Sequence, residues 1–90
     1  MPANNQGKKI KVERVQLGVR MEKRLVKVLK AMAEYHDMSL GDLMEGIILH
    51  GMEGNSPFSK ESIKHIQQFK DIYGMDYDSS AAHNFIEEGE

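Results

Sequence analysis

Three side chains with hydrogen-bonding ends lie close together near the start of the chain: Arg14, Gln16 and Arg20. An arginine guanidinium can donate two hydrogen bonds to O6 and N7 of guanine, and a glutamine amide can pair in the same bidentate way with N6 and N7 of adenine. Gly18, between them, has no side chain to hold a base away. The alternative is that the three are solvated residues on the outer face of a strand, with Gly18 as a twist point or bulge.

The polar residues alternate with apolar ones, Val15, Leu17, Val19 and Met21. A period of two predicts a strand with one buried and one exposed face, and we place this strand over residues 14–21. The alternative is an N-terminal extension of the helix that follows. Because three of the five residues at 15–19 are β-branched or glycine, the strand is favoured.

Helical periodicity begins at Glu22 and predicts a first helix that ends in a turn at residues 36–38. Ser39 is a strong N-cap for a second helix over residues 40–52. Ser59 is the predicted cap of a third helix, which Gly74 closes. A short last helix containing Phe85 and Ile86 is expected after a cap at residue 78 or 79.

A single strand leaves its backbone N–H and C=O groups unpaired, and the simplest partner is the same strand of a second copy across a two-fold axis. The predicted fold class is therefore mainly α with one short β-strand, forming an intertwined homodimer with a C-terminal helical extension. A two-stranded ribbon of this kind fits the DNA major groove. The residues predicted to form the dimer core are apolar: Val15, Leu17, Val19, Met21, Leu25, Leu29, Met32, Leu43, Met44, Ile47 and Ile48.

Composition excludes several classes of function. The chain has 90 residues and no cysteine, so disulfides and thiolate metal sites are absent. The four histidines lack metal-ligand spacing, and there is no phosphate-binding glycine loop or acid–base pair. We therefore predict no enzyme activity, no cofactor and no metal. The longest apolar runs are a few residues long, which predicts no membrane segment and a cytoplasmic location.

Charge is distributed unevenly. Residues 1–37 hold nine Lys and Arg against four Asp and Glu, whereas residues 38–90 hold three against ten. Such an asymmetry indicates that the front part, residues 1–37, binds a polyanion and that the acidic rear part, residues 38–90, has a different role.

The segments RVQLGVRM, EKRLVKVLKAMAEYH and DMSLGDLMEGIILHGME together resemble the ribbon-helix-helix family of the Arc and Met repressors. The resemblance implies a homodimer that binds double-stranded DNA and inserts its strand pair into the major groove. It assigns base reading to Gln16, Gly18 and Arg20. It assigns the phosphate clamp to the start of the second helix, at Ser39, Leu40 and Gly41.

Further DNA contacts are predicted from charge alone. Arg14 is placed with the base contacts, where it would read a base or grip a phosphate. The other predicted phosphate contacts are Lys9, Lys11, Lys23 and Arg24. The alternative is that they are solvated, in a tail for the first two and on a helix face for the last two.

The predicted organisation has three parts: a flexible basic arm over residues 1–12, a ribbon-helix-helix domain over 13–54, and an acidic helical extension over 55–90. The predicted function is that of a sequence-specific DNA-binding transcriptional regulator, a repressor. The alternatives are an antitoxin or a plasmid partition or transfer protein whose extension binds a partner, and a protein-interaction module that does not bind DNA. Whether residues 58–90 pack on the dimer or bind another protein stays open, as does the pairing of dimers into tetramers on DNA.

Overall fold

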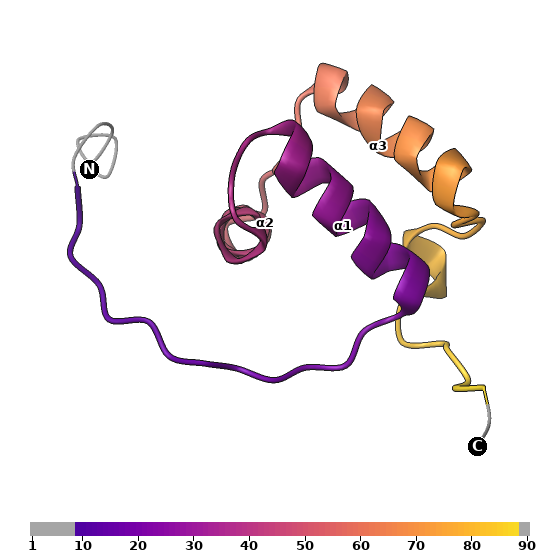
Figure 1. Ribbon diagram of the computed structural model, residues 1–90, viewed down its shortest axis with the longest axis horizontal. Coiled ribbons are helices and arrows are strands. Elements are labelled where there is room, and N and C mark those ends of the chain that lie inside the picture. The colour runs from indigo at the N-terminus through magenta and orange to yellow at the C-terminus, as the bar shows by residue number, and fades with distance from the viewer. Residues whose placement is uncertain (1–8, 89–90) are drawn as a thin grey trace.

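The computed structural model describes residues 9–88, which contain three α-helices and one short 3₁₀ turn. The helices are α1 (Lys23–Tyr35), α2 (Leu40–Met52) and α3 (Lys60–Tyr73), and the 3₁₀ turn is η2 (Ser79–Ala81). Figure 1 shows residues 9–22 as a long extended run that leaves the start of α1 and passes away from the helices. The first eight residues of the predicted arm lie outside the described part of the chain.

The predicted strand over residues 14–21 is wrong, and with it the ribbon-helix-helix fold class. The described residues contain no strand, and none of their backbone–backbone hydrogen bonds involves residues 9–21. A strand is stable only when another strand completes its ladder, and residues 22–88 supply helices and turns instead. The alternative of a helical extension is equally wrong, since α1 begins only at Lys23.

Local capping sets the ends of the helices. The hydroxyls of Ser39 and Ser59 accept hydrogen bonds from backbone N–H groups three residues later, which confirms both predicted N-caps. Gly74 ends α3 in the left-handed region at φ 69°, where a residue without Cβ has no steric penalty. Between α1 and α2, Asp37 also has a positive φ, of 58°, and makes the predicted turn.

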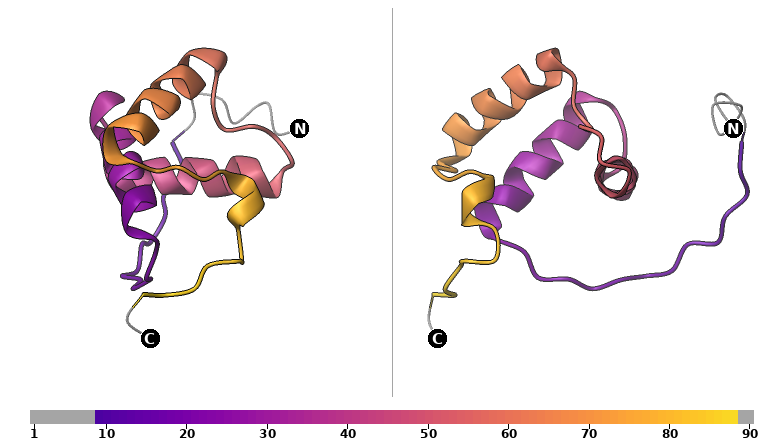
Figure 2. Two further views of the ribbon diagram at one scale, coloured as in Figure 1. Left: turned by 90° about the vertical axis from the view of Figure 1, so that its right-hand side faces the viewer. Right: turned by 180° about the vertical axis from the view of Figure 1, so that it is seen from behind.

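Helix α1 is the centre of the fold and contacts both other helices. Figures 1 and 2 show α3 antiparallel to α1 and beside it, while α2 crosses α1 steeply and is seen end-on in Figure 1. The buried core of the described residues is small: Val28, Met32, Ala33 and Leu43. Six partly buried apolar side chains pack against it: Leu29, Ile47, Phe58, Ile66, Phe69 and Met75.

The predicted last helix is shorter than expected and does not reach Phe85 and Ile86. Asp78 caps η2 by accepting a hydrogen bond from the N–H of Ser80, and the turn ends at Ala81. His83 follows with a positive φ of 68°, which breaks the helical path. Residues 84–87 therefore continue without regular structure, on the side of the molecule from which residues 9–22 also leave (Figure 1).

Candidate nucleic-acid interface

The four predicted base-contact residues lie on the extended run of residues 9–22. Arg14, Gln16, Gly18 and Arg20 are all exposed. A Cβ added at Gly18 would meet no atom within 4 Å, so the backbone there is open to a close approach. The run therefore presents three hydrogen-bonding side chains to solvent, together with the backbone of Gly18, which no side chain covers.

Arg14 joins this segment to α2 through a bidentate ion pair. Its Nε lies 2.9 Å from Glu45 Oε2, and a terminal nitrogen lies 2.8 Å from Oε1. The hydrogen bond to Glu45 raises the pKa of Arg14, and the same bond lowers the pKa of Glu45. Both side chains are largely exposed, so salt weakens the pair. Arg14 is thus held against the second turn of α2, which follows the turn that contains the predicted phosphate contacts.

Arg20 also has an acidic partner within the chain. Its guanidinium forms an ion pair with the carboxylate of Glu87, in the acidic rear part of the sequence. The side chain of Arg20 is 82% exposed, and that of Glu87 is half exposed. A phosphate or a guanine can therefore reach Arg20 by displacing a solvated carboxylate.

The predicted phosphate clamp lies at the N-terminus of α2. Ser39 Oγ accepts a hydrogen bond from the N–H of Asp42 at 3.1 Å. The N–H groups of Leu40 and Gly41 belong to the first turn, where a helix has no partners of its own for them. A Cβ at Gly41 would meet no atom within 4 Å, so the approach is open. The carboxylate of Asp42 works against an anion at this position.

The predicted basic contacts differ in their availability. Lys9, Lys11 and Lys23 are exposed, whereas Arg24 is half-buried and two of its three guanidinium nitrogens have partners within the chain. Arg24 Nε donates to Glu22 Oε2 at 3.0 Å, and one terminal nitrogen lies 3.1 Å from both Gly74 O and Asp76 Oδ1. This arrangement makes Arg24 a structural link between α1 and the residues after α3.

Glu22 and Tyr77 complete that link, which the sequence analysis missed. Glu22 Oε1 accepts hydrogen bonds from Tyr77 Oη at 2.6 Å and from the N–H of Leu25 at 3.0 Å, so a glutamate caps α1. Burial acts to raise the pKa of Glu22, but hydrogen bonds from Tyr77 and Arg24 outweigh it and lower the pKa to about 2. Burial and the bond to Glu22 raise the pKa of Tyr77 to about 12. The sequence signal was weak, because a glutamate cap is unusual and Tyr77 lies 55 residues away.

The predicted dimer-core residues fall into three groups in the described chain. Met32 and Leu43 are buried within the single chain. Four others are partly buried: Leu25, Leu29, Met44 and Ile47. The remaining five are exposed: Val15, Leu17, Val19, Met21 and Ile48.

Neither protein-family models nor curated proteins nor solved structures match the chain. Over residues 9–88, no group of three or more histidine or acidic side chains is arranged to hold a metal ion. None of the helices described there combines the length and apolar character needed to cross a bilayer.

Proposed function

We propose that the protein is a sequence-specific, double-stranded-DNA-binding transcriptional regulator that acts as a homodimer in the cytoplasm. One observation carries the proposal. The extended run of residues 9–22 presents Lys9, Lys11, Arg14, Gln16 and Arg20 outside the helical core. A segment with this composition and this exposure suits a polyanion whose surface also displays hydrogen-bonding base edges.

Binding strength in this proposal comes from charge. The basic residues concentrate in the first 37 positions, so the extended run and the start of α1 face the DNA, while the acidic residues 58–90 are kept away from phosphates. Lys9, Lys11 and Lys23 contact phosphates and fix the register of the protein on the duplex. Ser39, Leu40 and Gly41 supply a further phosphate contact at the start of α2.

Sequence discrimination comes from the polar side chains of the run. Arg20 donates both arms of its guanidinium to guanine, and Gln16 pairs with adenine, each contact contributing on the order of 1–3 kcal/mol of discrimination. Gly18 lets the backbone between them come close to the base edges. Arg14 and Arg20 exchange the carboxylates of Glu45 and Glu87 for DNA, because both ion pairs are solvent-exposed.

Dimerisation is supported by the apolar surface that a single chain leaves uncovered. On α2, Ile48, Leu49 and Met52 are 51%, 62% and 77% exposed. On the extended run, Val15 and Leu17 are about four-fifths exposed. A chain this small has few ways to stabilise itself besides association, and only four apolar residues are buried among those described. A two-fold dimer would present two copies of the run to a two-fold symmetric DNA site.

The alternative function is that of a protein-interaction module without DNA binding. The observation in its favour is that Arg14 and Arg20 already have carboxylate partners in the chain. Selection of bound duplexes from a randomised pool distinguishes the two functions. DNA reading is supported if the wild type enriches a common, two-fold symmetric sequence and if Arg20→Ala loses the preference for one base in each half-site. A pool that stays random after repeated rounds contradicts it.

A further inference from the structure

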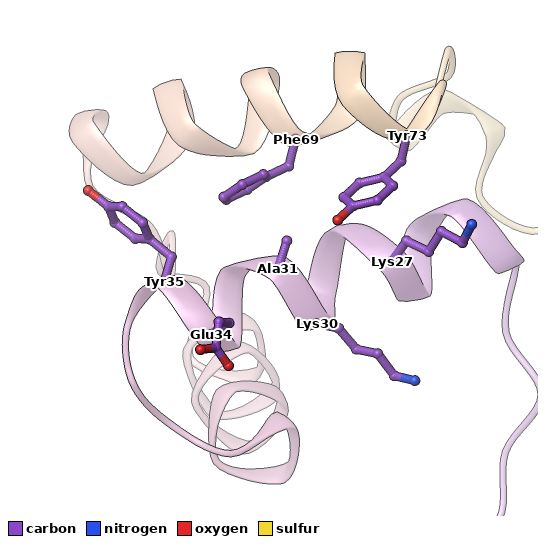
Figure 3. Close-up of a pocket in the computed structure, with 7 residues that line it drawn as sticks. All are labelled: Lys27, Lys30, Ala31, Glu34, Tyr35, Phe69 and Tyr73. Atoms are coloured by element: carbon purple, nitrogen blue, oxygen red, sulfur yellow. The ribbon is translucent and has the colours of Figure 1, made fainter.

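A groove between α1 and α3 is not explained by the proposed DNA interface. It has a volume of about 670 Å³, within the range of roughly 300–1,000 Å³ that is usual for binding clefts. Figure 3 shows the rings of Phe69 and Tyr73 extending from α3 over Ala31, with Tyr35 at one end. Aromatic side chains thus form its walls and a small residue lies between them.

The rim of this groove on α1 is basic. Lys27 and Lys30 line it and are both exposed. The Lys27 ammonium lies 5.9 Å from the centroid of the Tyr73 ring, which places a positive charge at the edge of the aromatic wall. Glu34 is the acidic residue of the lining, and Figure 3 shows it at the Tyr35 end, away from Lys27. The groove therefore suits an apolar side chain that is followed by negative charge.

A segment with that chemistry is present in the chain itself. Ile86 is 94% exposed, more than any other large apolar side chain described, and Glu87 and Glu88 follow it directly. Phe85 packs edge-to-face on Tyr77, with ring centroids 5.2 Å apart, beside the start of α1. Figure 1 shows residues 84–88 running away from α3, so the segment does not occupy the groove of its own chain.

We propose that the groove of one copy binds residues 85–88 of a second copy. Ile86 enters between Phe69, Tyr73 and Ala31, and the carboxylates of Glu87 and Glu88 face Lys27 and Lys30. Apolar burial supplies the affinity, and the charges set the direction of the segment. The donor's Glu87 leaves Arg20, so formation of this contact frees a predicted base-contact residue. The contact itself needs no DNA, so its failure and the failure of DNA binding are separate results.

The test uses the full chain as the receptor and a synthetic peptide of residues 82–90 as the probe. The receptor carries Ile86→Ser so that its own tail does not compete, and its amide resonances are followed during the titration. We expect saturable shifts at Ala31, Phe69 and Tyr73. We also expect a peptide with Ile86→Ser to bind at least ten-fold more weakly. Absence of shifts, or shifts confined to α2 or to residues 9–22, overturns the proposal.

Charge-reversal substitutions test the orientation in which residues 85–88 bind the groove. Lys27→Glu with Lys30→Glu in the receptor should weaken the peptide at least ten-fold, and a peptide with Glu87→Lys and Glu88→Lys should restore binding. The matched control, Lys60→Glu with Lys64→Glu on α3, changes the same charge outside the groove and should leave the affinity within two-fold. Equal weakening by both receptor pairs contradicts the assigned groove. When an isotope-labelled Ile86→Ser chain is mixed with unlabelled wild-type chain, the labelled groove resonances should move to the bound position. If they stay in the free position, although the wild-type chain alone shows the bound position, the chain's own tail is the occupant, which overturns the second-copy assignment.

Discussion

Removing one oxygen atom, by Tyr77→Phe, tests the link that anchors the start of α1. Tyr77 donates a 2.6 Å hydrogen bond to Glu22, the carboxylate that caps α1. The Glu22 side chain is 20% exposed, and its pKa is lowered from 4.5 to about 2, which corresponds to about 3 kcal/mol of stabilisation at neutral pH. A hydrogen bond to a charged group accounts for roughly 1.5–3 kcal/mol. Because Arg24 and the N–H of Leu25 remain, we expect a loss near the lower limit, about 1.5 kcal/mol.

The assay is thermal and urea unfolding, followed by circular dichroism at one fixed protein concentration. For a domain of this size, a loss of about 1.5 kcal/mol lowers Tm by roughly 6–12 °C. Tyr73→Phe is the matched control, because the Tyr73 hydroxyl makes none of the hydrogen bonds found among residues 9–88. Equal Tm values for the two variants would refute the assigned role of the Tyr77 hydroxyl.

The pH dependence gives the same link a second readout. A carboxyl whose pKa is lower in the folded state stabilises the fold above its unfolded pKa, and this contribution is lost as pH falls toward the folded value. For Glu22 the loss extends from about pH 4.5 down to about pH 2. The stability difference between the wild type and Tyr77→Phe should therefore shrink over that interval. A difference that stays constant from pH 7 to pH 2 would show that the hydroxyl does not act through the Glu22 carboxylate.

Three further predictions concern DNA and assembly. Arg20→Ala should leave the circular dichroism spectrum unchanged and remove protection at one base of each half-site in a footprint. An unaltered footprint would contradict the proposal that Arg20 recognises a base. Glu45→Gln should remove the carboxylate that competes with DNA for Arg14 and so tighten duplex binding at low salt, while Glu53→Gln at the far end of α2 should not. Ile48→Asp should reduce the mass measured by sedimentation to that of the 10.2 kDa monomer. Ile72→Asp, a change at an exposed residue of α3, should leave the dimer intact. Dimers of both variants would contradict the proposal that the dimer forms through the apolar face of α2.

The parts of the fold that could be predicted from sequence depend on local chemistry. Ser39 and Ser59 act within one helical turn, and Gly74 acts through its own backbone, so the bounds of α2 and α3 follow from neighbouring residues. The alternation at residues 14–21 predicts a strand, but a strand is stable only with a partner strand, which the local sequence does not contain. In the described chain the same residues are an extended, exposed run.

The site could be predicted only in part, for the same reason. Exposure of Arg14, Gln16 and Arg20 follows from their polarity, whereas their ion-pair partners do not. Glu45 lies 31 residues from Arg14, and two of the three partners of Arg24, Gly74 and Asp76, lie 50 and 52 residues away. The groove arises because α3 runs antiparallel to α1, which brings Tyr73 back beside Lys27. Such pairs depend on how the helices pack, and the residue pattern within one segment does not predict them.

The most direct test of the central claim is the affinity of the protein for a labelled 30-base-pair duplex, measured by fluorescence anisotropy from about 50 to 200 mM KCl. If Lys9, Lys11 and Lys23, the assigned phosphate contacts, each neutralise one phosphate in both copies of a dimer, the slope of log K against log salt approaches about −5, at 0.9 per neutralised phosphate. Substitution of all three by glutamine should flatten the slope while α1, α2 and α3 stay folded. A DNA-binding role for the extended run and the start of α1 would be contradicted if the wild-type protein left the duplex free at 50 mM KCl, or if it bound the duplex with no dependence on salt.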